Sequence, residues 1–205
     1  NLGYDIVKKN LIILTEKAKK HYNFLRLDME NSPYTSETIA LYKEALKIYP
    51  NVGIVLQAYM HRSVDDLNAL ANENFNCRIC KGIYIESEEI AYSDYEKIRE
   101  NYIKLVQIGL QKGSYIGIAG HDEYLINHLY QWIQDNNISK TQYEFQVLYG
   151  VPMEKTLEKL IQEGNKIRVY VPYGDNWYDY SIRRLKENPK MVGYIFKNIF
   201  KNIFG

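Results

Sequence analysis

The sequence has little of what marks a secreted, membrane-spanning or nucleic-acid-binding protein. Its 205 residues include only two cysteines, Cys77 and Cys80. A chain of this length can bury a core of its own, so it needs no disulfide or metal to fold. No apolar run approaches the roughly 18 residues of a membrane helix, and residues 1–10 lack the apolar segment of a signal peptide. Lys plus Arg number 26 against 25 Asp plus Glu, so the basic excess of nucleic-acid-binding proteins is missing and no nucleic-acid partner is expected.

The two cysteines form a single C-x-x-C with no second pair and no histidine at a zinc-ligand spacing. They lie in a segment that is predicted to be a strand. Residues i and i+3 of a strand point to opposite faces, so the two sulfurs should diverge. We therefore expect reduced thiols, as in a reducing cytoplasm, and no metal site.

Several nucleotide and hydrolase motifs are also missing. The chain contains no G-x-G-x-x-G, no G-x-x-x-x-G-K-[ST], no G-x-S-x-G and no H-E-x-x-H. A dinucleotide-binding fold with a glycine-rich turn, a P-loop and common hydrolase or zinc sites are disfavoured. Of the four histidines, only His121 follows a predicted strand.

What is present is a regular alternation of strand-like and helix-like hydrophobic periods. Gly113 and Gly164 mark helix ends, and Ser36 and Ser63 are the expected N-caps of two helices. Predicted strands cover residues 24–29, 51–59, 77–84, 115–119, 143–148 and 166–171. Predicted helices cover 4–20, 36–48, 63–71, 94–112, 123–136, 153–163 and 178–187. This alternation predicts a parallel sheet with helices outside it, either an open doubly wound sheet or part of a (β/α)8 barrel.

The chain is expected to be one domain over 1–205 with an amphipathic tail helix over 190–205. Phe196, Phe200 and Phe204 recur at a spacing of four, on one helical face. The favoured interpretation is a helix packed on its own domain. The alternative is a helix that binds a partner or makes a peripheral contact with a membrane surface.

Polar side chains stand at or near the carboxyl ends of the predicted strands, where parallel α/β folds bind ligands. Six such strands favour a shared site over separately satisfied core polar groups. The residues are Asp28, Met29, Glu30, Gln57, Tyr59, Arg78, Lys81, Tyr84, His121, Asp122, Gln146, Arg168 and Tyr170. Arg183 and Arg184 add a pair suited to a carboxylate or phosphate, although a solvated face paired with Glu187 also explains them.

Taken in order, these strand ends resemble the proline dehydrogenase family. The most specific stretch is Tyr170–Leu185, YVPYGDNWYDYSIRRL, and it is followed by Glu187-Asn188-Pro189. Four shorter stretches agree in order, and the resemblance covers about residues 20–190: Leu25–Glu30, Val55–Tyr59, Arg78–Tyr84 and, more loosely, Ile118–Asp122. The implied fold is a (β/α)8 TIM-type barrel, of which this chain would carry the C-terminal six β/α units.

The resemblance implies that L-proline is oxidised to Δ1-pyrroline-5-carboxylate by hydride transfer from C5 to FAD, with a quinone taking the electrons. Arg183 and Arg184 would bind the proline carboxylate, and Tyr170, Tyr180 and Tyr84 would shape the pocket around the ring. The protein's share would be positioning and electrostatics.

The same resemblance implies where the cofactor lies. Arg78 would be near the flavin N5, where positive charge stabilises the reduced anionic flavin. Asp28 and Met29 would line the site beneath the isoalloxazine, and Gln57 would hydrogen-bond the ring. The catalytic group implied is Asp28, Arg78 and Tyr84. The further cofactor contacts are Lys81, Gly82, Ile83, Gly120, His121 and Gln146.

The chain departs from the family pattern in places. Gly120 replaces a threonine, Ile83 replaces a small alanine and Cys80 replaces a valine-like residue. Two strands that precede the Asp28 strand in the family, one of them with a substrate-pairing lysine, have no counterpart. We therefore expect a fragment of a longer enzyme, with a truncated inactive barrel acting as a binding or assembly module as the alternative. A third interpretation, a phosphate-binding barrel enzyme, lacks a glycine-rich run near Tyr170–Arg184.

Overall fold

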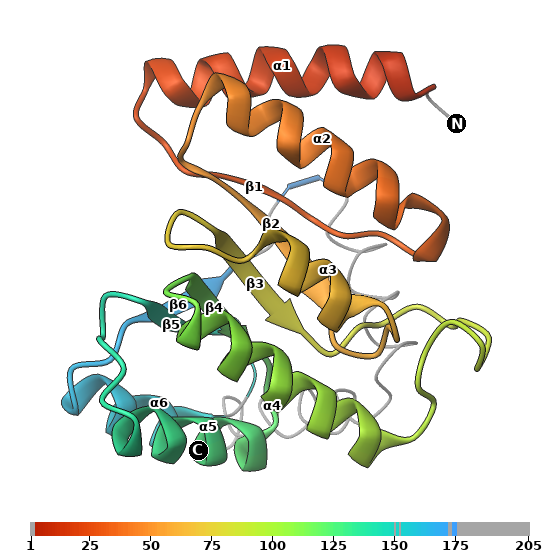
Figure 1. Cartoon of the computed structure of the whole chain (residues 1–205). Helices are drawn as coiled ribbons and strands as arrows, with labels where there is room; N and C mark the ends of the chain where they lie inside the picture. The colour runs from red at the N-terminus through yellow and green to blue at the C-terminus, as the bar shows by residue number, and fades with distance from the viewer. Residues whose placement is uncertain (1–2, 150, 152, 172–173, 176–205) are drawn as a thin grey trace.

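The computed structural model describes residues 3–149, 151, 153–171 and 174–175, and its strands and helices alternate as the sequence predicts (Figure 1). The elements are α1 (Tyr4–Lys20), β1 (Leu25–Leu27), a 3-10 turn η1 (Ser32–Tyr34), α2 (Thr35–Ile48), β2 (Val52–Gln57), α3 (Ser63–Leu70), β3 (Asn76–Cys80), α4 (Tyr95–Gln111), β4 (Tyr115–Ala119), α5 (Glu123–Asp135), β5 (Tyr143–Leu148), α6 (Glu154–Gln162) and β6 (Ile167–Tyr170).

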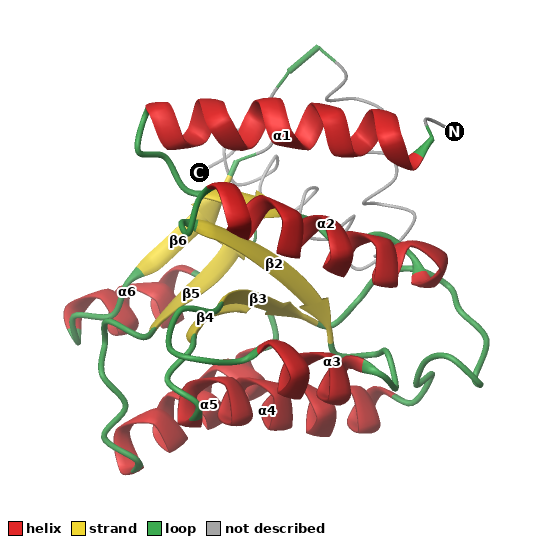
Figure 2. Ribbon diagram, turned by 45° about the horizontal axis from the view of Figure 1, so that its top comes forward, coloured by secondary structure: helices red, strands yellow, loops and turns green. Residues whose placement is uncertain are grey.

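The six strands form one parallel sheet whose spatial order is the chain order, β1-β2-β3-β4-β5-β6. The sheet curls, and α2 to α5 lie around its outer face (Figure 2). Because every strand runs the same way, all carboxyl ends meet at one edge. The register places Gln57 beside Cys80, and Gln146 between Ala119 and Arg168.

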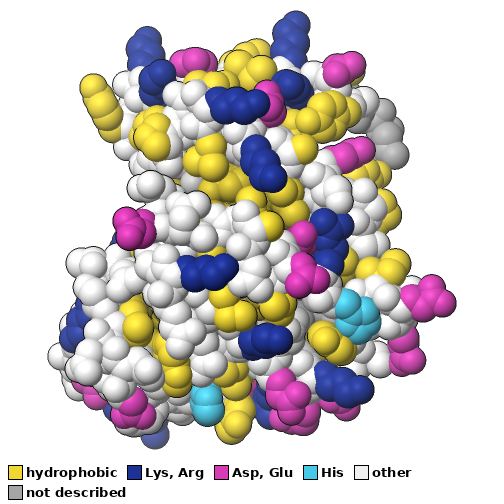
Figure 3. All heavy atoms as spheres, in the orientation of Figure 1, with side chains coloured by type: hydrophobic (Ala, Val, Ile, Leu, Met, Phe, Trp, Pro, Cys, Tyr) yellow, Lys and Arg dark blue, Asp and Glu magenta, His cyan; other side chains and the backbone are white. Residues whose placement is uncertain are grey.

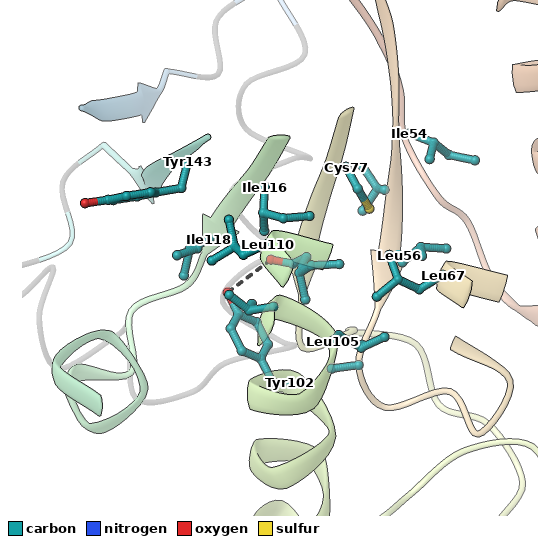
Figure 4. Packing of buried hydrophobic residues seen from close by; sticks show 14 of the residues in the cluster. Ile54, Leu56, Leu67, Cys77, Tyr102, Leu105, Leu110, Ile116, Ile118 and Tyr143 are labelled. Carbon is teal, nitrogen blue, oxygen red and sulfur yellow. Dashed lines mark hydrogen bonds between the residues drawn. The ribbon is translucent and has the colours of Figure 1, made fainter. Parts of the chain in front are cut away.

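Every second strand residue points outward into the hydrophobic core. Ile54, Ile79 and Ile118 are almost completely buried there, in one cluster with Leu67 and Leu105 from the helices. Figure 4 shows part of this cluster. Intervening residues point to the inner face of the curl, which is largely polar. On that face lie Arg26, Gln57, Asn76, Arg78, Tyr115, Glu144, Gln146, Arg168 and Tyr170.

Some predicted boundaries were wrong. The third strand ends at Cys80 rather than at residue 84, because Gly82 has a φ of +104° and turns the chain out of the sheet. Ser36 and Ser63 do not cap their helices: α2 begins at Thr35, and the Ser63 hydroxyl donates to the carbonyl oxygen of Gln57 at 2.5 Å. The 178–187 helix and the 190–205 tail lie outside the described residues.

The structure places both cysteines within one strand, as the sequence predicts. Both cysteines are free, and they lie in β3, with Cys77 fully buried. Burial raises the pKa of the Cys77 thiol to about 12 and that of Cys80 to about 11, which keeps both protonated at neutral pH.

The first helix packs on α2 rather than on the sheet. Figure 3 shows lysine and arginine side chains along its upper surface with apolar side chains among them. Ile6, Ile13 and Leu14 are about half exposed. Within the described residues, no helix is long and apolar enough to cross a membrane.

Candidate functional site

The carboxyl edge of the sheet carries an ion pair between β1 and β3. Arg78 points to the inner face, and its Nη2 donates to Oδ1 of Asp28, just after β1. The carboxylate is the more open partner, with 63% of its side chain exposed against 24% for Arg78. The pair bridges across β2 and places one positive and one negative group beside each other at the mouth of the curl.

Gln57, at the end of β2, is buried beneath this edge. Its Nε2 donates to the carbonyl oxygen of Met29 at 3.3 Å. Its Oε1 is buried and has no hydrogen-bond partner within the described part of the chain. An unpaired buried carbonyl is unfavourable by roughly 1–3 kcal/mol, so this oxygen marks a place where a donor from a ligand would fit.

The connection from β3 to α4 folds back over the sheet edge. Gly82 lies so close to Tyr59 that a Cβ would be 2.2 Å from its ring. Tyr84 donates a hydrogen bond to the Glu30 carboxylate, which ties this connection to the one after β1. Ile83 is 44% exposed.

Lys81 is already engaged by the protein. Its Nζ lies 2.6 Å from Oδ2 of Asp122 and 2.8 Å from the Tyr95 hydroxyl. The same carboxylate receives two hydrogen bonds from Arg99 of α4, at 2.8 and 2.9 Å, and the Arg99 guanidinium stacks on the rings of Tyr95 and Tyr124. The Lys81 side chain therefore anchors its loop, and its charge is balanced.

The segment after β4 brings Gly120 and His121 to the same edge. Nothing lies within 4 Å of a Cβ built on Gly120. The backbone N–H of Leu148 donates to Nε2 of His121 at 2.8 Å, so that nitrogen carries no proton and the ring is neutral with its proton on Nδ1. Desolvation lowers the pKa of His121, in keeping with the neutral form.

Strand β5 contributes Gln146 and a buried carboxylate. Gln146 Nε2 donates to Oε1 of Glu144 at 2.7 Å. Arg168 of β6 donates to both Glu144 oxygens, at 2.5 and 3.0 Å. The hydroxyl of Tyr115 adds a hydrogen bond at 2.9 Å, and Lys166 lies 3.1 Å away.

Of the residues predicted to contact the substrate, Tyr84 and Tyr170 are described; Tyr180, Arg183 and Arg184 lie outside the described residues. Tyr170 is 48% exposed and pairs in register with Leu148 on the inner face. Leu148 was not singled out from the sequence, although its alternation with Gln146 in β5 places it on the same face.

The structure thus gathers most of the predicted residues at one edge, where Asp28, Met29, Gln57, Arg78 and Tyr84 are linked directly or through neighbours. Sequence reasoning missed Glu144, Arg99 and the partners they hold. The available signal for Glu144 was a charged residue two positions before Gln146 in β5, and so on the same face of the strand. A shallow surface hollow of about 480 Å³ beside Asn72, Glu73 and Lys112 lies at the amino end of β3 and away from this site.

Comparison with known proteins identifies the family. The family model described as proline dehydrogenase matches residues 4–195. Proline dehydrogenase 2 of Bacillus subtilis is 36% identical over 201 residues, which are 98% of this chain and 66% of the relative. Proline dehydrogenase of Deinococcus radiodurans is 35% identical over 202 residues, 97% of this chain and 64% of that protein. This chain therefore spans just under two thirds of the length of these curated relatives.

A solved structure gives the same result for the fold. Proline utilization A from Bdellovibrio bacteriovorus, inactivated by N-propargylglycine, aligns with a TM-score of 0.81 and 27% identity, over 90% of this chain and 22% of the other. The homologue from Corynebacterium freiburgense aligns with a TM-score of 0.72 at 22% identity, over 93% of this chain and 24% of that one. The six parallel strands match the (β/α) barrel of these proteins, so the expected fold class is confirmed.

Proposed function

Because this chain belongs to the proline dehydrogenase family, we propose that it supplies the catalytic part of an enzyme that oxidises L-proline to Δ1-pyrroline-5-carboxylate. When bound, FAD would supply the redox chemistry, with C5 of proline as the hydride donor and a quinone as the electron acceptor. The chain's own residues bind the two molecules, orient them and balance their charges.

The buried Oε1 of Gln57, which has no hydrogen-bond partner among the described residues, is the observation that carries the flavin assignment. The isoalloxazine ring has an imide N–H, a donor of the kind this oxygen lacks. The polar groups at the same edge suit the rest of such a ligand, since they combine an arginine and the backbone of a glycine turn with the carbonyl oxygens of amide side chains. The residues that would hold FAD are Met29, Gln57, Arg78, Lys81, Gly82, Ile83, Gly120, His121 and Gln146.

The residues proposed to bind proline follow from the charges of that molecule. Proline is a small zwitterion, so its carboxylate requires a fixed cationic partner, which Arg183 and Arg184 would provide as a bidentate fork. Tyr84, Tyr170 and Tyr180 would enclose the ring. Asp28 keeps the Arg78 guanidinium in place through their ion pair.

The deciding experiment is an absorbance spectrum of the purified protein before and after anaerobic addition of proline. We expect flavin bands that bleach when proline is added. A colourless protein that takes up no added FAD would contradict the proposal and favour an inactive barrel that serves as a binding or assembly module.

Gln57→Leu tests the residue that carries the argument. The variant keeps the side-chain volume but removes the acceptor, so the dissociation constant for FAD should rise about tenfold, the value of one neutral hydrogen bond. The ligand-free protein should lose little stability, because an unpaired buried carbonyl is removed with it. Gln142→Leu, at the amino end of β5, is the matched control and should leave FAD binding unchanged. Equal FAD affinity in Gln57→Leu and the unchanged protein would remove Gln57 from the cofactor site.

A further inference from the structure

Glu144 is a buried charge that the proposed reaction does not use. Its side chain is 0% exposed, and it lies on the inner face of β5. Burial raises the pKa of Glu144, but hydrogen bonds from Arg168, Tyr115, Lys166 and Gln146 outweigh it and bring the pKa to about 2. The group is therefore a carboxylate at every pH at which the protein would work.

An ionised carboxylate can only accept hydrogen bonds. The Gln146 amide must therefore turn its NH₂ group toward Glu144, as the 2.7 Å contact shows. Its carbonyl oxygen is therefore turned away from the carboxylate. The positions of the nitrogen and the oxygen of the Gln146 amide are therefore fixed by the charge of Glu144.

Gly117 on the neighbouring strand leaves the room for this arrangement. Gly117 is the register partner of Glu144 on β4. A Cβ at Gly117 would lie 2.4 Å from Nε2 of Gln146 and 3.0 Å from its amide carbon. A larger residue there would push the amide away from Glu144.

We propose that Glu144 is a positioning residue, which orients the Gln146 amide so that its carbonyl oxygen accepts a hydrogen bond from an N–H or O–H group of the bound flavin. The inference rests on the proposed function. Gln57 and Gln146 would then act in the same way. The amide nitrogen of Gln57 also donates to a protein oxygen, which leaves its carbonyl oxygen to accept a hydrogen bond from a ligand. Two acceptors on β2 and β5 suit a ligand with several donors, such as the flavin imide and the ribityl hydroxyl groups.

A double-mutant cycle on FAD binding tests the proposal in the full-length protein. Glu144→Gln and Gln146→Ala should each raise the FAD dissociation constant about tenfold. Glu144→Gln should add less than about threefold when Gln146 is already alanine, because Glu144 acts through that amide. A purely structural role for Glu144 predicts the same loss in both backgrounds, and that outcome would overturn the inference.

Gly117→Ala tests the same amide without touching the ion pairs of Glu144, in case Glu144→Gln fails to fold. It should weaken FAD binding by a similar factor. Gly53→Ala is its control: a Cβ there meets Phe24 and Asn76, so it should lower stability and leave FAD affinity unchanged. FAD affinity unchanged in Gly117→Ala would contradict the proposal.

A ligand-free measurement separates this inference from the proposed function. In the unchanged protein the Gln146 side-chain NH₂ should give a nuclear magnetic resonance signal that exchanges slowly with solvent, and Glu144→Gln should abolish that protection. Rapid exchange in the unchanged protein would refute the orientation. A protein that shows slow exchange but takes up no FAD would refute the proposed function, and with it the flavin as the ligand of Gln146.

Discussion

Asp122 stands at the N-cap position of α5, yet its side chain makes no capping hydrogen bond to that helix. Its carboxylate joins α4 and the loop after β3 through Arg99, Tyr95 and Lys81. Only 7% of the side chain is exposed. A single residue thus fixes three segments that border the candidate site.

Asp122 should make the protein sensitive to acid. Burial acts to raise its pKa, but hydrogen bonds from Arg99, Lys81 and Tyr95 outweigh this and hold it well below 3.8. The folded state therefore binds fewer protons than the unfolded state, and the stabilisation present above the unfolded pKa is lost as the pH falls through and below that value.

Urea unfolding at several pH values measures this effect. Between pH 5 and pH 3, the unchanged protein should lose more free energy of unfolding than Asp122→Asn. Asp66→Asn, which removes an α3 carboxylate paired with Arg62 at the N-cap of the same helix, is the control and should follow the unchanged protein. Parallel curves for Asp122→Asn and the unchanged protein would disprove the assignment.

Gly82 should resist substitution. At a φ of +104° an L side chain is strained, and a Cβ would enter the Tyr59 ring. Gly82→Ala should lower the free energy of unfolding by about 1–3 kcal/mol. Gly120→Ala, where the Cβ meets nothing, should change it by less than about 1 kcal/mol. Thermal denaturation of the two variants measures the difference. Equal losses of stability would indicate a general effect of an added methyl group rather than local strain at Gly82.

At the scale of elements, Tyr102 connects α4 to the sheet. Figure 4 shows Tyr102 beneath the sheet. Its buried hydroxyl lies 3.1 Å from the carbonyl oxygen of Ile79 and 3.0 Å from that of Ala119. These carbonyls belong to neighbouring strands at their carboxyl ends. The helix is therefore held where β3 and β4 deliver their functional side chains.

Tyr102→Phe should lower the free energy of unfolding by about 1–3 kcal/mol, because it removes the only donor of that ring from two buried carbonyl groups. Tyr22→Phe is the control, since Tyr22 is 88% exposed and its hydroxyl is solvated. Guanidinium unfolding of both variants measures the difference. Equal midpoints would mean that the Tyr102 hydroxyl does not hold α4.

The order and type of the elements could be predicted from the hydrophobic periodicity and from the glycines that end helices. Gly113 and Gly164, predicted to end helices, have φ values of +79° and +76° just beyond α4 and α6. The end of β3 could not be predicted, because the sequence of Lys81–Tyr84 continues the strand pattern while the positive φ of Gly82 breaks it. Ser63 lies at the start of α3, but tertiary packing gives its hydroxyl a partner on Gln57 instead of its own helix.

The site was predictable only in part. The alternation of strands and helices predicts a parallel sheet, and this is enough to place Asp28, Gln57 and Arg78 on the same side of the molecule. The partner of Lys81 is 41 residues away, and that of Arg168 is 24 residues away, so a single sequence could not reveal either. The catalytic and binding roles themselves stay predictions until flavin and proline binding are measured.

At the scale of the molecule, the loops around the site form a connected rim. Glu86 accepts hydrogen bonds from the backbone and the hydroxyl of Ser32, both at 2.8 Å, and Glu30 accepts one from Tyr84. The connections after β1 and β3 therefore meet across β2. A ligand in the curl would contact segments from several strands together.

Binding of FAD should therefore stabilise the whole protein. At a hundredfold excess over the dissociation constant, the free energy of unfolding should rise by about 2.7 kcal/mol, which corresponds to roughly 5–10 °C in Tm for a chain of this size. A thermal scan with and without FAD measures it, with NAD as the control ligand because the G-x-G-x-x-G motif is missing. No shift with FAD, or an equal shift with NAD, would contradict a specific flavin site.

The spatial order of the strands equals their order in the chain, and this bears on how the protein is made. During translation, each new strand finds its partner in the strand that left the ribosome just before it. From β1 to β6 the sheet can then grow one strand at a time as synthesis proceeds. On the growing side, the newest strand is open to aggregation only until the next stretch of nascent chain covers it.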